Sequence, residues 1–532
     1  MLTDLARRAA HRATFEVAKT ALERDLAALV QGAPAAGSSG GPRIGIATFG
    51  SGEWHLAIDL LLAHALAVRG ARPSLLMCDA PALPVCDERI VTSRHQSRCD
   101  GCFAAKRGLL EAGRVPYDLL STMVPAHGIV DAAATVAALR DEDLESFQFD
   151  GWPIGQWLHV SASHFLRQDA RALGRDSVDA RRRWLATAIV SCQAVTTWLD
   201  RIRPDLVLVQ GGAHVRWRVA RELARARGIP VMSREMGKGG WDHHLYALNA
   251  DCLMPDLDAA WADARRQPLS EEEERVVDRW LASLPAMTHG AVASARPFRV
   301  PPAADDVRTA VAFTNVTWDL ATAGRDVAFT GVRDWLDATI DVLASRPRVR
   351  LIVRVHPAEA ATGTRERVGD WLRHRYAHVA NLVLVDPEDA VAVPELLAHA
   401  DVALAYNSTA GIEAATLGVP VVVCGAPHFR NRGFTIDVDT RLQYREYLDG
   451  WCGGAAWLVP DDASMLARRY MHLFFARYTI PMGLTTSPLA PPFTLRVRSY
   501  EELSPGRNAA LDHVCSAILA ARQPLLPREG AA

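Results

Sequence analysis

The sequence of 532 residues predicts an α/β fold with two doubly wound, Rossmann-like domains that face each other across a cleft, followed by a C-terminal helix. In both halves, continuously apolar runs alternate with amphipathic helical patterns, which is typical of parallel strands covered by helices on both faces. The Pro/Ala-rich segment ASARPFRVPPAADD separates the two halves. The chain is also longer than the roughly 250–300 residues that one hydrophobic core serves.

The N-terminal half contains four apolar runs that we expect as buried strands. They are RIGIATFG, PSLLMC, DLVLVQGG and IPVMSRE, with helices expected at EWHLAIDLLLAHALAVRG and RWRVARELARARG. A charged helix precedes them and leads into GAPAAGSSGGP, a composition typical of a flexible linker. We therefore expect an N-terminal helix and linker over 1–42 and a first Rossmann-like domain over 43–255.

The C-terminal half repeats the pattern with the runs RTAVAFT, RLIVRVHP, NLVLVD, DVALAYN and PVVVCG. Before these runs, SEEEERVVDRWLASL predicts a charged helix, and TSPLAPPF after them predicts a chain break. The expected boundaries are 256–305 for a helix and linker, 306–485 for the second Rossmann-like domain, and 486–532 for a tail helix.

Composition and charge exclude several classes of protein. A hydrophobic fraction of 49% with 23% charged residues is typical of a globular chain, and a net charge of −2 argues against nucleic-acid binding. The first residues carry charges every few positions, so they predict no signal peptide, and no run reaches the roughly 18 apolar residues of a membrane-spanning helix. We expect a cytoplasmic protein whose nine cysteines are thiols or metal ligands.

The segment AYNSTAGIEAATLGVPVVVCG predicts an anion site. A buried strand ends just before Asn407, Ser408 and Thr409, where a helix is expected to begin with backbone N–H groups directed at a phosphate. Gly411 would leave the first turn open, and Glu413 lies one turn further on, where its carboxylate could accept ribose hydroxyls. The alternative is an ordinary helix cap, although Glu413 does not have the spacing of a capping box.

Basic residues after two other strands could serve the same anion. His356 and Arg354 lie on one face of the strand in RLIVRVHPAE, where buried cations are costly unless they meet an anion. His356 would stabilise charge on the leaving nucleotide, and Arg354 would position it. His428, Arg430 and Arg432 follow the strand PVVVCG. The alternatives are a core histidine bonded to a carbonyl and a solvated basic loop.

These motifs resemble the capsule polysaccharide biosynthesis proteins, relatives of the bacterial Kdo transferases. The resemblance is carried by RVHP, NSTAGIEAATLGVPVVV and GFTID, and also by TNVTWDLA with DVAFTGVRDWL, and it spans Arg43 to roughly Leu448. It implies a GT-B fold and a nucleotide-sugar donor that is CMP- or UDP-linked. By the same resemblance, His356 and Glu413 are the donor-binding pair, with Ser408 and Thr409 at the phosphates.

Polar residues after the N-terminal strands are candidates for catalysis on the acceptor. Sugar transfer needs a base for the acceptor hydroxyl or a group that stabilises a cationic transition state. Asn315 and Asp319, which follow RTAVAFT, are added to the donor-binding set because they would close the cleft from the other side. The acceptor-side positions are Glu53, His55, Gln210, His214 and Glu235, of which we favour Glu53, His55 and Glu235 for catalysis.

Four cysteines lie within one predicted loop region. Cys99 and Cys102 have the spacing of a metal knuckle, and Cys78 with Cys86 would complete a tetrahedral structural zinc site. An iron–sulfur cluster and unligated thiols are the alternatives. Asp242-His243-His244 is interpreted as a solvated polar loop without a role, and we expect no organic cofactor.

The hypothesis from the sequence is a GT-B-type glycosyltransferase that moves a sugar from a nucleotide-sugar donor to a bacterial surface polysaccharide or glycolipid. Two alternatives stay open on the same scaffold: a nucleotide-sugar 2-epimerase and a polyol-phosphate transferase. A third is a non-catalytic nucleotide- or glycan-binding protein of an assembly complex. Peripheral association with inner-membrane machinery is compatible with each of them.

Overall fold

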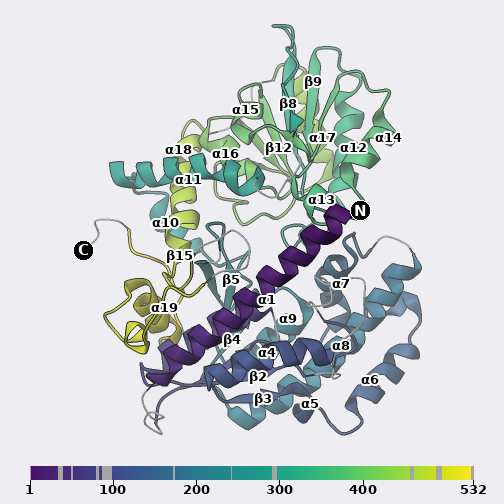
Figure 1. Ribbon diagram of the computed structural model, residues 1–532. Helices are drawn as coiled ribbons and strands as arrows, with labels where there is room; N and C mark the ends of the chain where they lie inside the picture. The colour runs from purple at the N-terminus through teal and green to yellow at the C-terminus, as the bar shows by residue number, and fades with distance from the viewer. Residues whose placement is uncertain are drawn as a thin grey trace. The chain divides into compact units, whose positions relative to one another are not determined.

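The chain divides into two compact units in the computed structural model (Figure 1). The first unit comprises Met1–Phe165, Gly174–Asp256 and Tyr478–Pro527, and the second comprises Leu166–Leu173, Leu257–Arg477 and Arg528–Ala532. The structure describes residues 2–33, 40–49, 52–79, 83–86, 99–171, 174–240, 242–289, 296–455, 460–486 and 494–528.

The first unit is built on a seven-stranded sheet with the order β15-β6-β5-β4-β1-β2-β3. Strands β1 to β5 pair in parallel, whereas β6 and β15 are antiparallel additions at one edge. The chain order reverses between β1 and β4, which makes this the switch point of the sheet. The bounds are β1 (Arg43–Ala47), β2 (Arg72–Met77), β3 (Tyr117–Leu119), β4 (Leu206–Gln210), β5 (Val231–Met236), β6 (His243–Leu248) and β15 (Thr479–Pro481).

Helices cover both faces of this sheet, as continuously apolar strands require. One face shares a core with α1 (Leu2–Gln31), α2 (Glu53–Ala67), α4 (Cys99–Gly113) and α19 (Ala509–Leu519). The other face packs against α8 (Arg175–Ile202) and α9 (Val215–Ala226). Gly45 permits this approach, because a Cβ there would lie 2.6 Å from the Trp198 ring. Shorter helices are α5 (Leu120–Met123), α6 (Gly128–Ala137) and α7 (Leu158–Leu166).

The second unit is built on a six-stranded parallel sheet with the order β10-β9-β8-β12-β13-β14. Its switch point lies between β8 and β12, because the chain runs outward from β8 through β9 to β10 and then from β12 through β13 to β14. The bounds are β8 (Arg308–Phe313), β9 (Val349–Arg354), β10 (Leu382–Val385), β12 (Val402–Ala405), β13 (Val421–Val423) and β14 (Ile436–Asp437), with β7 (Arg296–Pro297) and β11 (Asp389–Ala390) forming a separate pair.

Two groups of helices flank the second sheet (Figure 1). Helices α12 (Val332–Leu343), α14 (Val368–Tyr376) and α17 (Arg441–Cys452) share a core with one face. The opposite side carries α15 (Val393–Leu397) and α16 (Ala410–Thr416), with α18 (Ala463–Met471) against α16. Helices α10 (Asp258–Ala264) and α11 (Glu271–His289) pack on α18, and α13 (Ala358–Ala361) follows β9.

The predicted α/β class with two doubly wound, Rossmann-like sheets is confirmed, and each of the nine apolar runs forms a strand. The division of the chain differs from the predicted boundaries at both ends of the second domain. The helices after Asp256 belong to the second unit, where Trp261 packs against Phe434 and Tyr470. The chain from Tyr478 onward returns to the first unit, where β15 extends the sheet. Residues 34–39 of the predicted linker lie outside the described residues.

The interpretation of Asp242-His243-His244 as a solvated loop is wrong. His243 begins β6, and His244 is buried within the sheet. The Asp242 carboxylate accepts from the backbone N–H groups of Leu484 and Thr485, at 2.8 and 2.9 Å, and so fastens the returning C-terminal segment. Periodicity did not predict this strand because its polar residues pair with tail residues more than 200 positions away.

Within the described residues, no helix is long and apolar enough to cross a membrane.

Candidate functional site

The carboxyl ends of three adjacent strands meet at the switch point of the second sheet. Thr314 and Asn315 follow β8, which lies between β9 and β12. The Thr314 hydroxyl accepts from the His356 N–H after β9 at 3.0 Å, and the Asn315 side-chain oxygen accepts from the Asn407 N–H after β12 at 3.1 Å. The segment that contains His356 and the segment that begins at Asn407 therefore both contact Thr314-Asn315. The two predicted donor-binding segments lie on either side of these two residues.

His356 lies at this edge with a defined ring tautomer. The side chain is half-buried, and its Nδ1 accepts from the Ala358 N–H at 3.2 Å. A ring nitrogen that accepts carries no proton, so the neutral imidazole has its proton on Nε2. His356 can thus donate a hydrogen bond through Nε2, and it is not sealed in the apolar core.

The helix after Asn407 is shorter than its sequence suggests. α16 begins at Ala410, and its first N–H groups already have partners: Ala410 donates to the Ser408 hydroxyl at 3.3 Å, and Ile412 donates to the Thr409 carbonyl at 3.0 Å. The expectation of free backbone donors in the first turn is therefore wrong for these two groups. Ser408 and Thr409 are themselves half-buried at the edge of the sheet.

Gly411 and Glu413 occupy the buried side of this short helix. A Cβ at Gly411 would lie 3.0 Å from the ring of Phe429, so the glycine makes room for a protein side chain rather than for a phosphate. Glu413 has an exposed fraction of only 7%. Glu413 lies on α16, four residues after Thr409.

The guanidinium of Arg354 is directed away from the switch point. It donates to the carbonyl of Asp386 and, at 3.1 Å, to that of Asp389, in the loop after β10. Burial lowers the pKa of Arg354 to about 10, partly countered by the carboxylates of that loop. The geometry gives Arg354 the role of holding the neighbouring loop.

The three basic residues after β13 also have partners within the protein. The Arg430 guanidinium donates to three backbone carbonyls and to the Asp439 carboxylate. Arg432 donates to Asp258 at 2.6 Å, and the His428 ring stacks on Phe474 with the centroids 3.8 Å apart. These contacts give the predicted basic loop a packing role in the second unit.

Asp319 lies in the turn after β8, where its carbonyl accepts from the N–H groups of Thr322 and Ala323. Its side chain is exposed, unlike that of Asn315, which is buried.

Glu359, which the sequence patterns did not indicate as a site residue, lies three residues beyond His356 and is buried. Its carboxylate accepts from the Val368 N–H at the start of α14, at 3.1 Å. Burial raises the pKa of Glu359 to about 7, although Arg367 and the backbone hydrogen bonds act in the opposite direction. An acid three residues after a strand-ending histidine was the only sequence signal.

The switch point of the first sheet is lined by charged residues. Asp59 on α2 and Arg234 on β5 form a buried ion pair at 2.6 Å. Burial lowers the pKa of His55 well below its usual value, and the charge of Arg234 adds to this effect. Burial also raises the pKa of Glu235, and the Met236 N–H and Arg234 partly counter it. Glu53 lies in the first turn of α2 and is half-buried.

A histidine pair, His214 just after β4 and His164 on α7, lies in the same unit. His214 and His164 approach through their Nε2 and Nδ1 atoms at 3.2 Å, and the Ser161 hydroxyl is 3.3 Å from the other ring nitrogen of His214. The charge of His214 also acts on Glu235. His214 was among the candidates but not favoured, and His164 was missed because its helix, α7, lies far away in sequence.

The predicted metal knuckle does not form a loop. Cys99 and Cys102 lie in the first turn of α4, and the side chain of Cys99 is outside the described residues. Cys102 accepts from the buried Lys106 ammonium at 3.1 Å, and Cys78 donates to a backbone carbonyl. Among the described side chains, no three His, Cys, Asp or Glu residues come together to hold a metal. The zinc site, including Cys86, stays a prediction that metal analysis can test.

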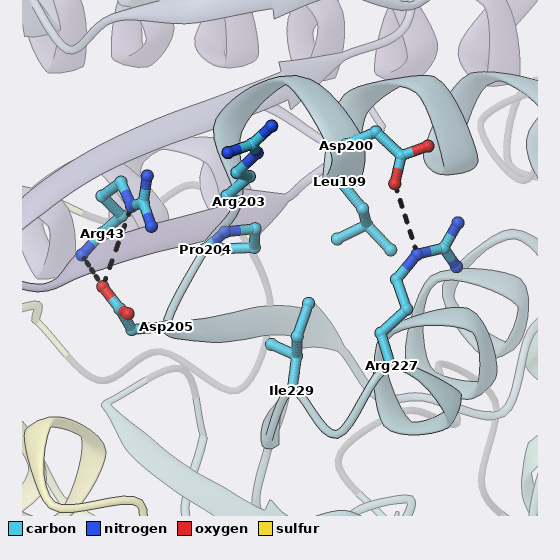
Figure 2. A pocket seen from close by; sticks show the side chains of 8 residues that line it. All are labelled: Arg43, Leu199, Asp200, Arg203, Pro204, Asp205, Arg227 and Ile229. Carbon is cyan, nitrogen blue, oxygen red and sulfur yellow. Dashed lines mark hydrogen bonds and ion pairs between the residues drawn. The ribbon is translucent and has the colours of Figure 1, made fainter.

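A pocket lies at the opposite, amino-terminal edge of the first sheet (Figure 2). In it, Arg43 approaches Asp205 and Arg227 approaches Asp200. None of the predicted site residues lines this pocket, so it contributes nothing to the site above. Its lining is Arg43, Leu199, Asp200, Arg203, Pro204, Asp205, Arg227 and Ile229.

Two doubly wound sheets, with a C-terminal segment that returns to the first of them, define a GT-B-like fold. Residues 325–446 match the family model described as "Capsule polysaccharide biosynthesis protein", which confirms the resemblance found in the sequence. The match lies within the second unit and includes His356, Glu413 and the basic loop. No curated protein matches the chain.

Solved structures similar to this chain include two glycosyltransferases and one epimerase. KpsC β-Kdo 2,4 transferase from Thermosulfurimonas dismutans is 16% identical, with 59% of this chain and 86% of that one covered at a TM-score of 0.32. UDP-GlcNAc 2-epimerase from Neisseria meningitidis is 10% identical, with 81% and 97% covered at 0.23. The glycosyltransferase SnogD from Streptomyces nogalater is 16% identical, with 81% and 94% covered at 0.22. TM-scores this low assign neither activity nor substrate.

Proposed function

We propose that the chain is a glycosyltransferase that uses a CMP- or UDP-linked sugar donor and a polysaccharide or glycolipid acceptor in the cytoplasm of a bacterium. The observation that carries the proposal is the meeting of His356 and Asn407 at Thr314-Asn315. Ligands of open α/β sheets bind beyond the carboxyl ends of the strands at the switch point, which is where these residues lie. The family match to the same part of the chain supports the proposal.

In this proposal the donor is bound by neutral and acidic groups of the second unit. His356 donates through Nε2 to a phosphate oxygen and so stabilises the charge that develops on the leaving nucleotide. Ser408 and Thr409 bind the phosphates through their hydroxyls, and Glu413 accepts from the ribose. Asn315 holds the Asn407 backbone in place and thereby fixes the start of the segment that carries both hydroxyls.

The acceptor is assigned to the carboxyl edge of the first sheet, where Glu235 is the favoured base. Burial raises its pKa, and a base whose pKa lies closer to neutrality transfers protons more effectively. His55 is a weaker candidate, because burial and Arg234 disfavour its protonated form. Glu53 and the His214–His164 pair would orient the acceptor hydroxyl.

A thermal-shift panel of CMP, UDP, GDP and CDP tests the donor assignment. A ligand that binds only the folded state stabilises it by mass action, so one or two nucleotides should raise the melting temperature while the others do not. His356→Ala should remove most of that shift. His399→Ala is the matched control, because His399 is an exposed histidine elsewhere in the same unit.

Turnover of the stabilising nucleotide-sugar separates the reaction classes. Release of nucleotide that requires an added glycan acceptor supports transfer. Conversion of the nucleotide-sugar without an acceptor would instead indicate an epimerase. If His356→Ala and wild type bind every nucleotide equally, the proposed donor site is wrong.

A further inference from the structure

A short segment from the N-terminal half of the chain packs into the second unit. Residues Leu166–Leu173 lie between α7 and α8 in sequence, yet they cluster with the second sheet. The Arg167 carbonyl accepts from the Arg365 N–H at 2.9 Å, in the turn between α13 and α14. Arg171 forms ion pairs with Asp169 and with Asp326, which precedes α12. The segment is therefore fastened to the second unit at two points.

The two arginines of this segment differ in their surroundings. The Arg171 guanidinium has two carboxylate partners. The Arg167 guanidinium lies over the ring of Trp318, 4.5 Å from its centroid, and no described residue accepts a hydrogen bond or forms an ion pair with it. Its backbone adopts a left-handed φ of +59°, which is strained for a residue with a Cβ.

The ring under Arg167 is fixed at the edge of the sheet that carries the candidate site. Trp318 follows β8, four residues after Thr314, and its indole N–H donates to the Thr364 hydroxyl at 3.0 Å. Thr364 lies in the turn between α13 and α14, eight residues beyond His356. Arg167 thus lies where the segment after β8 contacts the turn between α13 and α14, and the same β8 segment makes the Thr314–His356 contact.

Burial of the Arg167 guanidinium costs free energy unless an anion binds to it. Arg167 is half-buried, and burial lowers its pKa while the charge of Asp319 partly restores it. A guanidinium has five N–H donors, and a cation that loses water without gaining acceptors is disfavoured. Strain in the backbone adds to the cost, and such strain clusters at ligand sites.

We propose that Arg167 binds a phosphate group of the donor nucleotide, as a residue that the N-terminal half of the chain contributes to the second unit. This inference rests on the proposed nucleotide site and adds to it the phosphate-binding cation. Arg354, Arg430 and Arg432 are engaged by carbonyls and carboxylates of the protein. Arg167 presents its planar fork without such partners, and that fork matches two phosphate oxygens.

The test measures dissociation constants of pyrophosphate, UDP, CMP and uridine for wild type, Arg167→Gln and Arg167→Lys by calorimetry. Arg167→Gln should weaken binding of the phosphorylated probes by about ten- to hundredfold, the effect of one charge-assisted hydrogen-bonding group, and should leave uridine unchanged. Arg167→Lys should weaken binding of the phosphorylated probes by an intermediate factor, because lysine keeps the positive charge but lacks the planar guanidinium. Arg348→Gln, at an arginine whose side chain is 80% exposed, is the control and should change nothing.

Each outcome separates this inference from the proposed function. Loss of pyrophosphate binding in Arg167→Gln, with no preference of wild type for any nucleoside, would keep the inference and overturn the nucleotide-sugar proposal. Nucleotide binding that is equal in wild type and Arg167→Gln would overturn the inference and keep the proposal. Absence of binding of all four probes to wild type would overturn both. Unchanged thermal unfolding of Arg167→Gln excludes misfolding as the cause.

Discussion

The two sheets present different chemistry at their carboxyl edges. At the second sheet, Thr314 and Asn315 make neutral hydrogen bonds to the backbone of the neighbouring loops. At the first sheet, the corresponding edge holds the buried Asp59–Arg234 pair with Glu235 beside it. The carboxyl edge of the second sheet therefore has neutral hydrogen bonds between loops, whereas the carboxyl edge of the first sheet has buried charges.

This difference suggests a division of labour. Fixed hydrogen bonds between loops hold a binding surface in shape without competing for the charge of an anionic ligand. Buried charges shift pKa values, which general acid–base chemistry requires. We infer that the second edge binds the donor and that the first edge carries the proton transfer.

The largest expected effect concerns Glu235. If the first edge supplies the base, Glu235→Gln should lower kcat by about a hundredfold to ten-thousandfold, the range for removal of a general base. Nucleotide affinity should stay as in wild type, since the donor is assigned to the other unit. Steady-state kinetics together with a nucleotide titration measures both quantities, and a loss confined to nucleotide affinity would break the proposed division.

The next effect concerns the buried ion pair. Asp59→Ala leaves Arg234 charged and unpaired at a site where the two side chains have exposed fractions of 9% and 4%. Removal of one partner of a buried pair costs about 3–5 kcal/mol of unfolding free energy. Chemical denaturation should show this loss, and the double variant Asp59→Ala/Arg234→Met should recover part of it. Equal stability of wild type and Asp59→Ala would show that the pair is not buried as described.

A third prediction concerns the pH dependence of the second unit. The pKa of Glu359 is raised from 4.5 to about 7, so the folded state binds its proton more tightly than the unfolded chain does. The resulting stabilisation is complete below pH ~4.5 and is lost as the pH rises through ~7. Glu359→Gln should flatten this decline, which is on the order of 3 kcal/mol. Denaturation midpoints between pH 4.5 and 7.5 measure it, with the exposed Glu446→Gln as the control.

The smallest effect concerns the neutral edge. Asn315→Ala leaves the buried Asn407 N–H without its 3.1 Å acceptor, which should cost about 1–3 kcal/mol. Because Asn315 also fixes the loop that carries Ser408, nucleotide affinity should fall with stability. Asn315→Asp keeps an acceptor at this position and should restore the backbone contact. If Asn315→Ala loses neither stability nor nucleotide affinity, then Asn315 does not fix the loop that carries Ser408.

Sequence patterns predicted the strands well because buried parallel strands are continuously apolar, as at DLVLVQGG and PVVVCG. They also predicted that His356 and Asn407 each lie directly after a buried strand, and these two strands, β9 and β12, flank β8 in the sheet. The patterns failed where a polar side chain is satisfied by a distant partner. Asp242 binds tail residues, and Arg432 binds Asp258, and neither arrangement leaves a local signal.

Arg167 could not be predicted from the sequence either, because its surroundings depend on tertiary packing. Nothing in its local sequence distinguishes it from Arg171, and the chain contains 59 Lys and Arg residues in total. Its significance comes from the placement of Leu166–Leu173 in the second unit, which depends on tertiary packing.

Hydrogen exchange in the presence of the most stabilising nucleotide tests the central claim most directly. Binding of the donor to the second unit should add protection at residues 314–318, 355–358 and 407–413, the backbone that surrounds the switch point of the second sheet. Residues 52–55 and 233–237, at the edge of the first sheet, should gain no protection. Protection at the first edge alone, with the second edge unchanged, would contradict the assignment of the donor to the second unit.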